Sequence, residues 1–212
     1  MSYAPATALD AHHDDEGPLM AHGSVLQTQI SNGKLGMWLF LGSEVMFFTG
    51  LIGAYVVLRF GQDAWPRPDQ RLNVPLTAIN TFFLICSSVT LVWALQAYQQ
   101  NNKAKGTLGL LATTIIGAAF VGIQAYEYFE LYVHKEIRPN TDLFGTCFYT
   151  MTGFHGFHVF VGVLALGVLT VMGMLGKFGP KYSQYAPIEI VGLYWHFVDL
   201  VWIVLFAIVY LM

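Results

Sequence analysis

The pattern of apolar and polar positions divides the chain into five long apolar runs separated by short polar segments. The runs lie at about 35–58, 76–97, 108–131, 148–175 and 188–212. Because a helix rises about 1.5 Å per residue, some 20 apolar residues span the hydrocarbon core of a bilayer. Apolar and polar residues do not alternate at every second position, as they do in membrane-embedded strands. We therefore predict an all-α membrane protein, a bundle of five transmembrane helices.

A polar tail, residues 1–33, precedes the predicted membrane domain at 34–212. The tail lacks a basic segment followed by an apolar one, so we do not expect a cleaved signal peptide. Its composition favours a solvated, partly disordered arm over a metal site. The residues that would form such a metal site are a cluster of acids and histidines: Asp10, His12, His13, Asp14, Asp15, Glu16 and His22.

The last apolar run carries an acid near its middle. A charged carboxylate at that depth costs roughly 2.5–3.5 kcal/mol on insertion scales, yet Asp199 is present there. His196 lies three residues earlier and shares its helical face, and Trp195 and Trp202 flank the pair at helical spacing. A polar pair in the membrane requires partners, so neighbouring helices should supply them.

Glu44 is the sole acid of the first run and has no base within one turn. Burial disfavours the charged form of such a carboxyl. Two interpretations remain open: a functional carboxyl linked to protons or facing lipid, or a protonated acid that hydrogen-bonds an adjacent helix. Because acids inside membrane spans usually have functions, we favour the first.

The fourth run contributes His155 and His158, which share one helical face, and Glu127 lies near the end of the third. A histidine pair at this spacing can ligate a metal, but a complete site would need further ligands from other spans. Buried histidines that pair with acids are the commoner arrangement. We expect no metal site, and instead an interhelical polar cluster of Glu127, His155, His158, His196 and Asp199.

The segment after the first run carries residues suited to the level of the lipid headgroups. Arg59, Trp65 and Arg67 are the interfacial, lipid-contacting candidates, and the prolines that flank Arg67 prevent a continuous helix. The distribution of Lys and Arg between the two sides favours, by a small margin, a cytoplasmic N-terminus.

The composition agrees with a membrane protein, at 55% hydrophobic and 11% charged residues, and the net charge of −3 suggests no nucleic-acid partner. Walker A, HExxH and CxxCH motifs are absent from the sequence. Three intramembrane histidines are too few for a histidine-rich di-iron site, or for several haem and copper ligands. The chain therefore looks like a subunit of a larger membrane complex, without a redox centre or catalytic site of its own.

Three sequence segments together resemble subunit III of the haem-copper oxidases, the cytochrome c oxidase subunit III family. They are WHFVD at 195–199 followed by Trp202, FHGFHV at 154–159, and the Ser43–Glu44 pair, with QAYEY at 124–128 in support. The resemblance covers about 34–212. It implies a non-redox subunit that packs against subunit I beside subunit II, whose haems and copper reduce dioxygen and pump protons.

The same resemblance implies several further properties of the chain. Glu44 matches the family's buried, carbodiimide-reactive carboxyl, and the subunit would support proton uptake and stability during turnover. Phospholipid is a possible ligand, a larger respiratory supercomplex is possible, and the location would be the bacterial cytoplasmic (inner) membrane. Five spans match the family's short bacterial form, which lacks two helices and part of the lipid cleft.

Three alternatives to a cytochrome c oxidase subunit remain. The first is the same subunit in a quinol oxidase or in a relative that accompanies nitric oxide reductase. The second is a stand-alone membrane metalloenzyme that uses His155, His158 and His196. The third, a proton-coupled transporter built on Glu44 and Asp199, is disfavoured because no inverted repeat is detectable.

The absence of a redox site in the chain can be tested on the chain alone. After purification without companion subunits, it should show no visible haem absorbance and no stoichiometric metal by elemental analysis. One tightly bound iron or copper per chain would contradict the prediction and support the metalloenzyme.

Overall fold

A computed structural model of the chain describes residues 32–63, 65–66, 71–134, 139 and 142–212. Within these ranges it contains five helices long and apolar enough to cross a membrane, and no strand, which confirms the predicted fold class. The helices are α1 (Asn32–Phe60), α3 (Val74–Gln99), α4 (Lys103–Val133), α5 (Leu143–Met174) and α6 (Tyr182–Phe206). A π-helical turn, η1 (Ala207–Leu211), continues α6. Most of the predicted tail lies outside the described residues.

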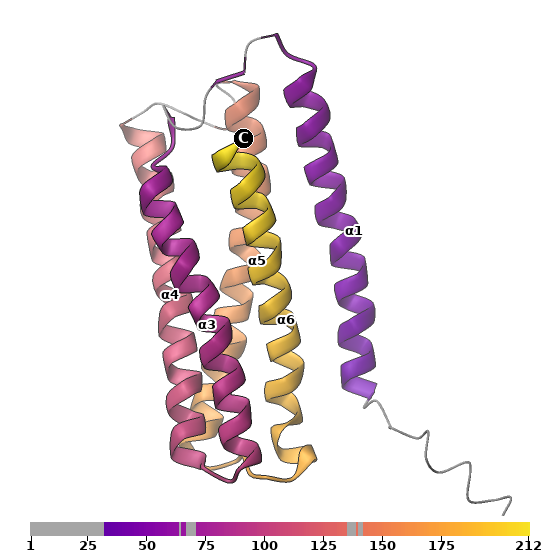
Figure 1. The fold of residues 1–212 in the computed structure, drawn as a ribbon, viewed down its shortest axis with the longest axis vertical. Helices are drawn as coiled ribbons and strands as arrows, with labels where there is room; N and C mark the ends of the chain where they lie inside the picture. Colours follow the sequence, from indigo (N-terminus) through magenta and orange to yellow (C-terminus); the bar gives the residue numbers. More distant parts are fainter. Residues whose placement is uncertain (1–31, 64, 67–70, 135–138, 140–141) are drawn as a thin grey trace, which may run out of the picture.

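Four of the helices form a closed ring, and the fifth lies outside it. Helix α3 packs against α4, α4 against α5, α5 against α6, and α6 against α3. Helix α1 packs on the outside of this ring against α6 and, to a lesser extent, α5 (Figure 1). With five spans, α1 and α6 begin on the same side of the bundle and run parallel.

Three helices begin two to five residues before the apolar runs do, because short polar side chains cap them. The side-chain oxygens of Asn73, Asn102 and Asp142 each accept a hydrogen bond from the backbone N–H three residues later, at 3.3, 3.2 and 2.7 Å. Such bonds satisfy N–H groups that have no partner within the helix. The expected starts at 76, 108 and 148 are therefore later than the helices' actual first residues.

Helix α1 attaches to the ring through a narrow seam. Its buried residues, Leu41, Phe48 and Tyr55, recur every seven positions, and Lys34 continues the series toward the N-terminus. Glu44 lies between Leu41 and Phe48 on the same stripe. A repeat of seven keeps one stripe of a helix facing its neighbours along the full length. Most of the remaining surface of α1 is exposed and apolar.

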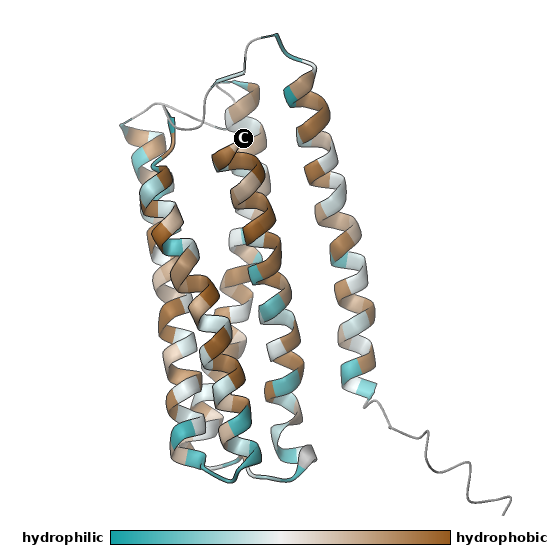
Figure 2. Ribbon diagram, in the orientation of Figure 1, coloured by the Kyte–Doolittle hydropathy of each residue, from teal (hydrophilic) through white to brown (hydrophobic). Residues whose placement is uncertain are grey.

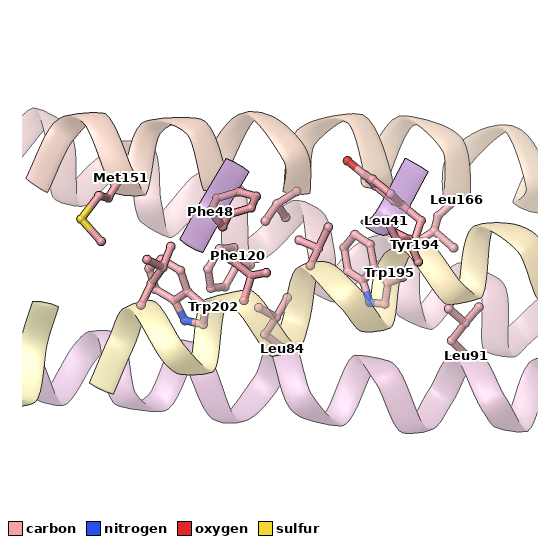
Figure 3. Close-up of a cluster of buried hydrophobic side chains, with 14 of the residues drawn as sticks. Leu41, Phe48, Leu84, Leu91, Phe120, Met151, Leu166, Tyr194, Trp195 and Trp202 are labelled. Carbon is pink, nitrogen blue, oxygen red and sulfur yellow. The ribbon is translucent and has the colours of Figure 1, made fainter. Parts of the chain in front are cut away.

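Two indole rings of α6 form the centre of the bundle. Trp195 and Trp202 are completely buried, and Figure 3 shows them on α6 between the ribbons of α5 and α3. Their Nε1–H groups donate to Ser87 Oγ and Thr81 Oγ1 of α3, each at 2.9 Å. The large rings thus contribute apolar contact area while their polar atoms join two helices.

The helices approach these rings closely because glycines face them. A Cβ atom at Gly117 of α4 would lie 2.6 Å from Trp195, and one at Gly162 of α5 would lie 2.8 Å from the same ring. Glycine is therefore required at both positions for contact between helices rather than for backbone conformation.

Hydrophilic residues gather at the ends of the helices, whereas their lengths are mostly hydrophobic (Figure 2). Hydrophilic bands also interrupt α6 along its length. Large exposed apolar side chains occur on every one of the five helices. Such a surface is compatible with lipid or with other membrane subunits, and not with water.

The contact between glycine and tryptophan gives a matched test of packing. Gly117→Ala should lower stability by about 1–3 kcal/mol, because the added methyl group overlaps the Trp195 ring. Gly122→Ala on the same helix is the control: a Cβ there meets nothing within 4 Å, and alanine favours the helix. Thermal unfolding in detergent measures both, and equal melting temperatures would contradict the prediction.

Candidate functional site

Glu44 of α1 lies against His158 of α5. The distance between His158 Nε2 and Glu44 Oε2 is 3.1 Å, and the side chains are 12% and 18% exposed, respectively. The other ring nitrogen of His158, Nδ1, lies 2.7 Å from the backbone oxygen of Phe154. The carboxyl of the first span thus has a base as its partner, on a helix more than 100 residues away in sequence.

These contacts determine how many protons the pair holds. A carbonyl oxygen can only accept, so His158 Nδ1 carries a hydrogen and donates it to Phe154. A hydrogen bond between His158 Nε2 and Glu44 Oε2 then requires one more proton between these two atoms. The pair is then either an imidazolium with a carboxylate or a neutral imidazole with a carboxylic acid. Both arrangements have zero net charge, which is the inexpensive state in a low-dielectric environment.

Aromatic rings surround this acid–base pair. Phe48, Phe157 and Phe47 lie 5.1, 6.0 and 6.4 Å from the His158 ring, measured between centroids. The hydroxyl of Tyr194 donates to the backbone oxygen of His158 at 2.9 Å. The rings restrict the access of solvent to the Glu44–His158 pair. The tyrosine connects α6 to the turn of α5 that carries His158.

A second polar group joins α3 to α6. Ser88 Oγ donates a hydrogen bond to Asp199 Oδ2, and His196 Nδ1 lies 2.9 Å from the same Ser88 oxygen. His196 and Asp199 therefore converge on one serine of the neighbouring helix. The second carboxyl oxygen, Asp199 Oδ1, is buried and has no hydrogen-bond partner among the described residues.

Glu127 belongs to a third group, close to the end of α4. It accepts hydrogen bonds from Thr77 Oγ1 of α3 at 3.2 Å and from the Tyr210 hydroxyl of η1 at 3.1 Å. The carboxyl is buried. It connects the π-helical turn to two other helices at the same level.

His155 is enclosed by aromatic rings rather than by acids. It is 1% exposed, stacks on Trp202 with centroids 4.7 Å apart, and meets Phe120 edge to face. Neither ring nitrogen has a hydrogen-bond partner in the described part of the chain. The neighbouring helix α4 carries Gln124, whose side chain is also buried.

The residues expected to form one polar cluster are thus divided among separate contacts. His196 and Asp199 meet on Ser88, while His158 pairs with Glu44 and not with these two. Across 32–63, 65–66, 71–134, 139 and 142–212, no group of three or more His, Cys, Asp or Glu could hold a metal ion.

Two of the three interfacial candidates, Arg59 and Trp65, lie at the end of the bundle near the C-terminus. Arg59 donates to the Tyr55 hydroxyl at 3.3 Å and to the backbone oxygen of Met212. Trp65 packs edge to face on Tyr55 and Phe144, with centroids 5.6 and 6.0 Å apart. Arg67, the third candidate, lies outside the described residues.

Sequence reasoning missed an ion pair between α1 and α6. Lys34 Nζ lies 2.5 Å from Glu189 Oε1, with both side chains partly buried. The signal was available, because the first and fifth of five spans begin on the same side of the membrane. Each carries one charge near its start, so the two charges lie at the same depth.

The fold and these contacts define a class: a multi-pass helical membrane protein with intramembrane acids held by hydrogen bonds between helices. Comparison with known proteins gives the family. Residues 19–212 match the model of the family described as cytochrome c oxidase subunit III.

Three curated relatives agree with this chain over most of its length, and each is named cytochrome c oxidase subunit 3. The protein from Bacillus sp. (strain PS3) is 36% identical over 85% of this chain and 86% of its own length. That of Alkalihalophilus pseudofirmus is 33% identical over 94% and 96%. That of Synechocystis sp. is 39% identical over 84% and 74%.

The chain belongs to the cytochrome c oxidase subunit III family, as its motifs predicted. It is accordingly a multi-pass membrane subunit of a haem-copper oxidase, an oxidoreductase complex that contains other subunits.

The Ser88 contact predicts the effect of removing Asp199. Asp199→Leu removes the acceptor of the Ser88 hydroxyl, and should weaken folding and assembly by roughly 1 kcal/mol, the usual size of a hydrogen bond between membrane helices. Asp199→Asn keeps an acceptor oxygen and should retain most of the stability. Melting in detergent distinguishes them, and a leucine variant as stable as the wild type would refute the role.

Proposed function

We propose that this chain is the non-redox subunit III of a cytochrome c oxidase. It packs against subunit I, next to subunit II, in the bacterial cytoplasmic membrane with its N-terminus in the cytoplasm. It supports proton uptake and the stability of the catalytic subunit while electrons pass from cytochrome c to dioxygen. Haem and copper are bound by the partner subunits, and phospholipid is a possible ligand of this one.

The observation that carries the proposal is the pairing of Glu44 with His158. The pair is partly accessible and is embedded between α1 and α5. With one proton held between Nε2 and Oε2 its net charge is zero, whereas gaining or losing a proton leaves a charge in a poorly solvated place. An acid and a base in direct contact between two membrane helices supply the acceptor and the donor that a proton-linked site requires.

The electron donor is proposed from the relatives alone. Proteins similar to this chain are named as subunits of cytochrome c oxidase, which favours cytochrome c over quinol as the donor. The stand-alone metalloenzyme receives no support from the contacts of His155, His158 and His196 described above.

A substitution that keeps the shape of Glu44 tests the proton-linked role. In the assembled oxidase, Glu44→Gln can still donate a hydrogen bond to His158 Nε2 but cannot release a proton. Haem spectra should be unchanged, while the rate of proton uptake or the number of turnovers before inactivation should fall severalfold. Stopped-flow proton uptake and oxygen consumption over time provide the two measurements.

The adjacent residue supplies the control. Ser43 is exposed, and its hydroxyl bonds the carbonyl oxygen of Phe40 within α1, so Ser43→Ala should leave both readouts as in the wild type. A loss of haem absorbance in the Glu44→Gln complex would mean a structural role. Normal uptake and normal lifetime would mean that the pair has no part in proton delivery.

A further inference from the structure

The outward side of the α3–α6 contact combines one polar group with an apolar surround in the middle of the membrane span. We propose that this surface binds a transmembrane helix of another oxidase subunit, which donates a hydrogen bond to His196 Nε2. We call it the α3–α6 face; it comprises Ile85, Ser88, Val92, His196, Leu200 and Ile203. The inference rests on the proposed function, since it requires an assembled oxidase.

The hydrogen bonds leave one ring nitrogen of His196 directed to the surface. With Asp199 as the carboxylate that accepts the single hydroxyl hydrogen of Ser88, His196 Nδ1–H donates to Ser88 Oγ. The neutral imidazole then has a lone pair on Nε2. That atom is not among the buried unpaired atoms, and it has no partner in the described part of the chain. It is an acceptor at the molecular surface.

The depth of this acceptor excludes the usual partners. The span runs over Ser183–Leu211, so His196 lies about 20 Å from either end at a rise of about 1.5 Å per residue. Water is absent at that depth, and headgroups lie at the interfaces. Acyl chains cannot form hydrogen bonds, so an acceptor facing them is left unsatisfied at a free-energy cost. A protein side chain is the remaining donor.

The surroundings indicate the chemistry of that partner. Leu200 and Ile203 of α6 are 61% and 44% exposed, and they follow His196 at helical spacing. Ile85 and Val92 of α3 are 41% and 53% exposed and flank Ser88 in the same way. The face therefore suits an apolar helix that carries one hydroxyl, indole or amide donor at mid-depth.

A second copy of this chain fits the face less well than a different subunit does. In a two-fold dimer, the same patch would meet itself. The other side chains of the face are apolar except Ser88, whose hydroxyl hydrogen is already donated to Asp199, so a second copy offers no donor to His196 Nε2. A partner with a donor at this position satisfies the acceptor, as the histidine requires.

A pair of leucines allows a matched experiment in the complete oxidase. The tagged full chain is expressed with the other oxidase subunits and purified in mild detergent, and the haem absorbance recovered per tagged chain is measured. Leu200→Trp places a bulky ring on the α3–α6 face. Leu164→Trp, on the outer side of α5 at 55% exposure, is the control. His196→Leu removes the acceptor itself.

We expect Leu200→Trp to reduce the recovered haem about tenfold, a change that corresponds to about 1.4 kcal/mol, while Leu164→Trp leaves it unchanged. His196→Leu should reduce it less, through the loss of one hydrogen bond. Equal recovery from the two tryptophan variants would overturn the surface assignment alone. Failure of the wild-type chain to recover any haem would overturn the proposed function, and the assignment with it.

A second measurement covers the case in which the tryptophan variant folds poorly. A photo-reactive phenylalanine analogue at 200 should cross-link to another oxidase subunit, identified by mass spectrometry, and one at 164 should not. Cross-links from 200 to a second copy of the same chain, or to lipid alone, would contradict the proposal.

Discussion

Polar side chains inside the hydrocarbon region must find their partners within the protein, and this requirement determines how the helices are paired. Glu44 aligns α1 with α5, Ser88 aligns α3 with α6, and Glu127 connects α4 with η1 and α3. Each contact also fixes the rotation of a helix about its axis, because only one stripe can face the partner. Apolar contacts alone would allow these helices to pack in many arrangements. The few polar contacts select one of them.

Shape complementarity acts together with these bonds. Trp195 is packed against glycines of α4 and α5 while its Nε1–H reaches Ser87 of α3, so one side chain sets the spacing of three neighbouring helices. In lipid, association of helices depends on close packing and on hydrogen bonds between them, because apolar burial gives little advantage there. The central indoles of α6 contribute both the close packing and the hydrogen bonds.

The sequence predicted the number of spans and identified acids and histidines that require partners, because both follow from local composition and helical spacing. It could not predict the partners themselves. His158 was expected beside His196 and Asp199, yet it meets Glu44, since the pairing depends on how α1 is seated against the ring. Nothing in the sequence singled out Ser88, because its span contains several serines and threonines that can bond a neighbouring helix or their own backbone. The starts of α4 and α5, directly after the capping residues Asn102 and Asp142, were predictable from the residue preferences of helix N-termini.

The position of α1 outside the ring has a consequence for biosynthesis. Helix α1 is synthesised before the other described helices, yet it packs chiefly against α6 and α5, which follow α3 and α4 in the chain. Until then Glu44 lacks its partner His158, and a polar group without a partner is costly in hydrocarbon. The four later helices can close on themselves meanwhile, since their contacts form a complete ring. Helix α1 can therefore dock onto a ring that is already complete.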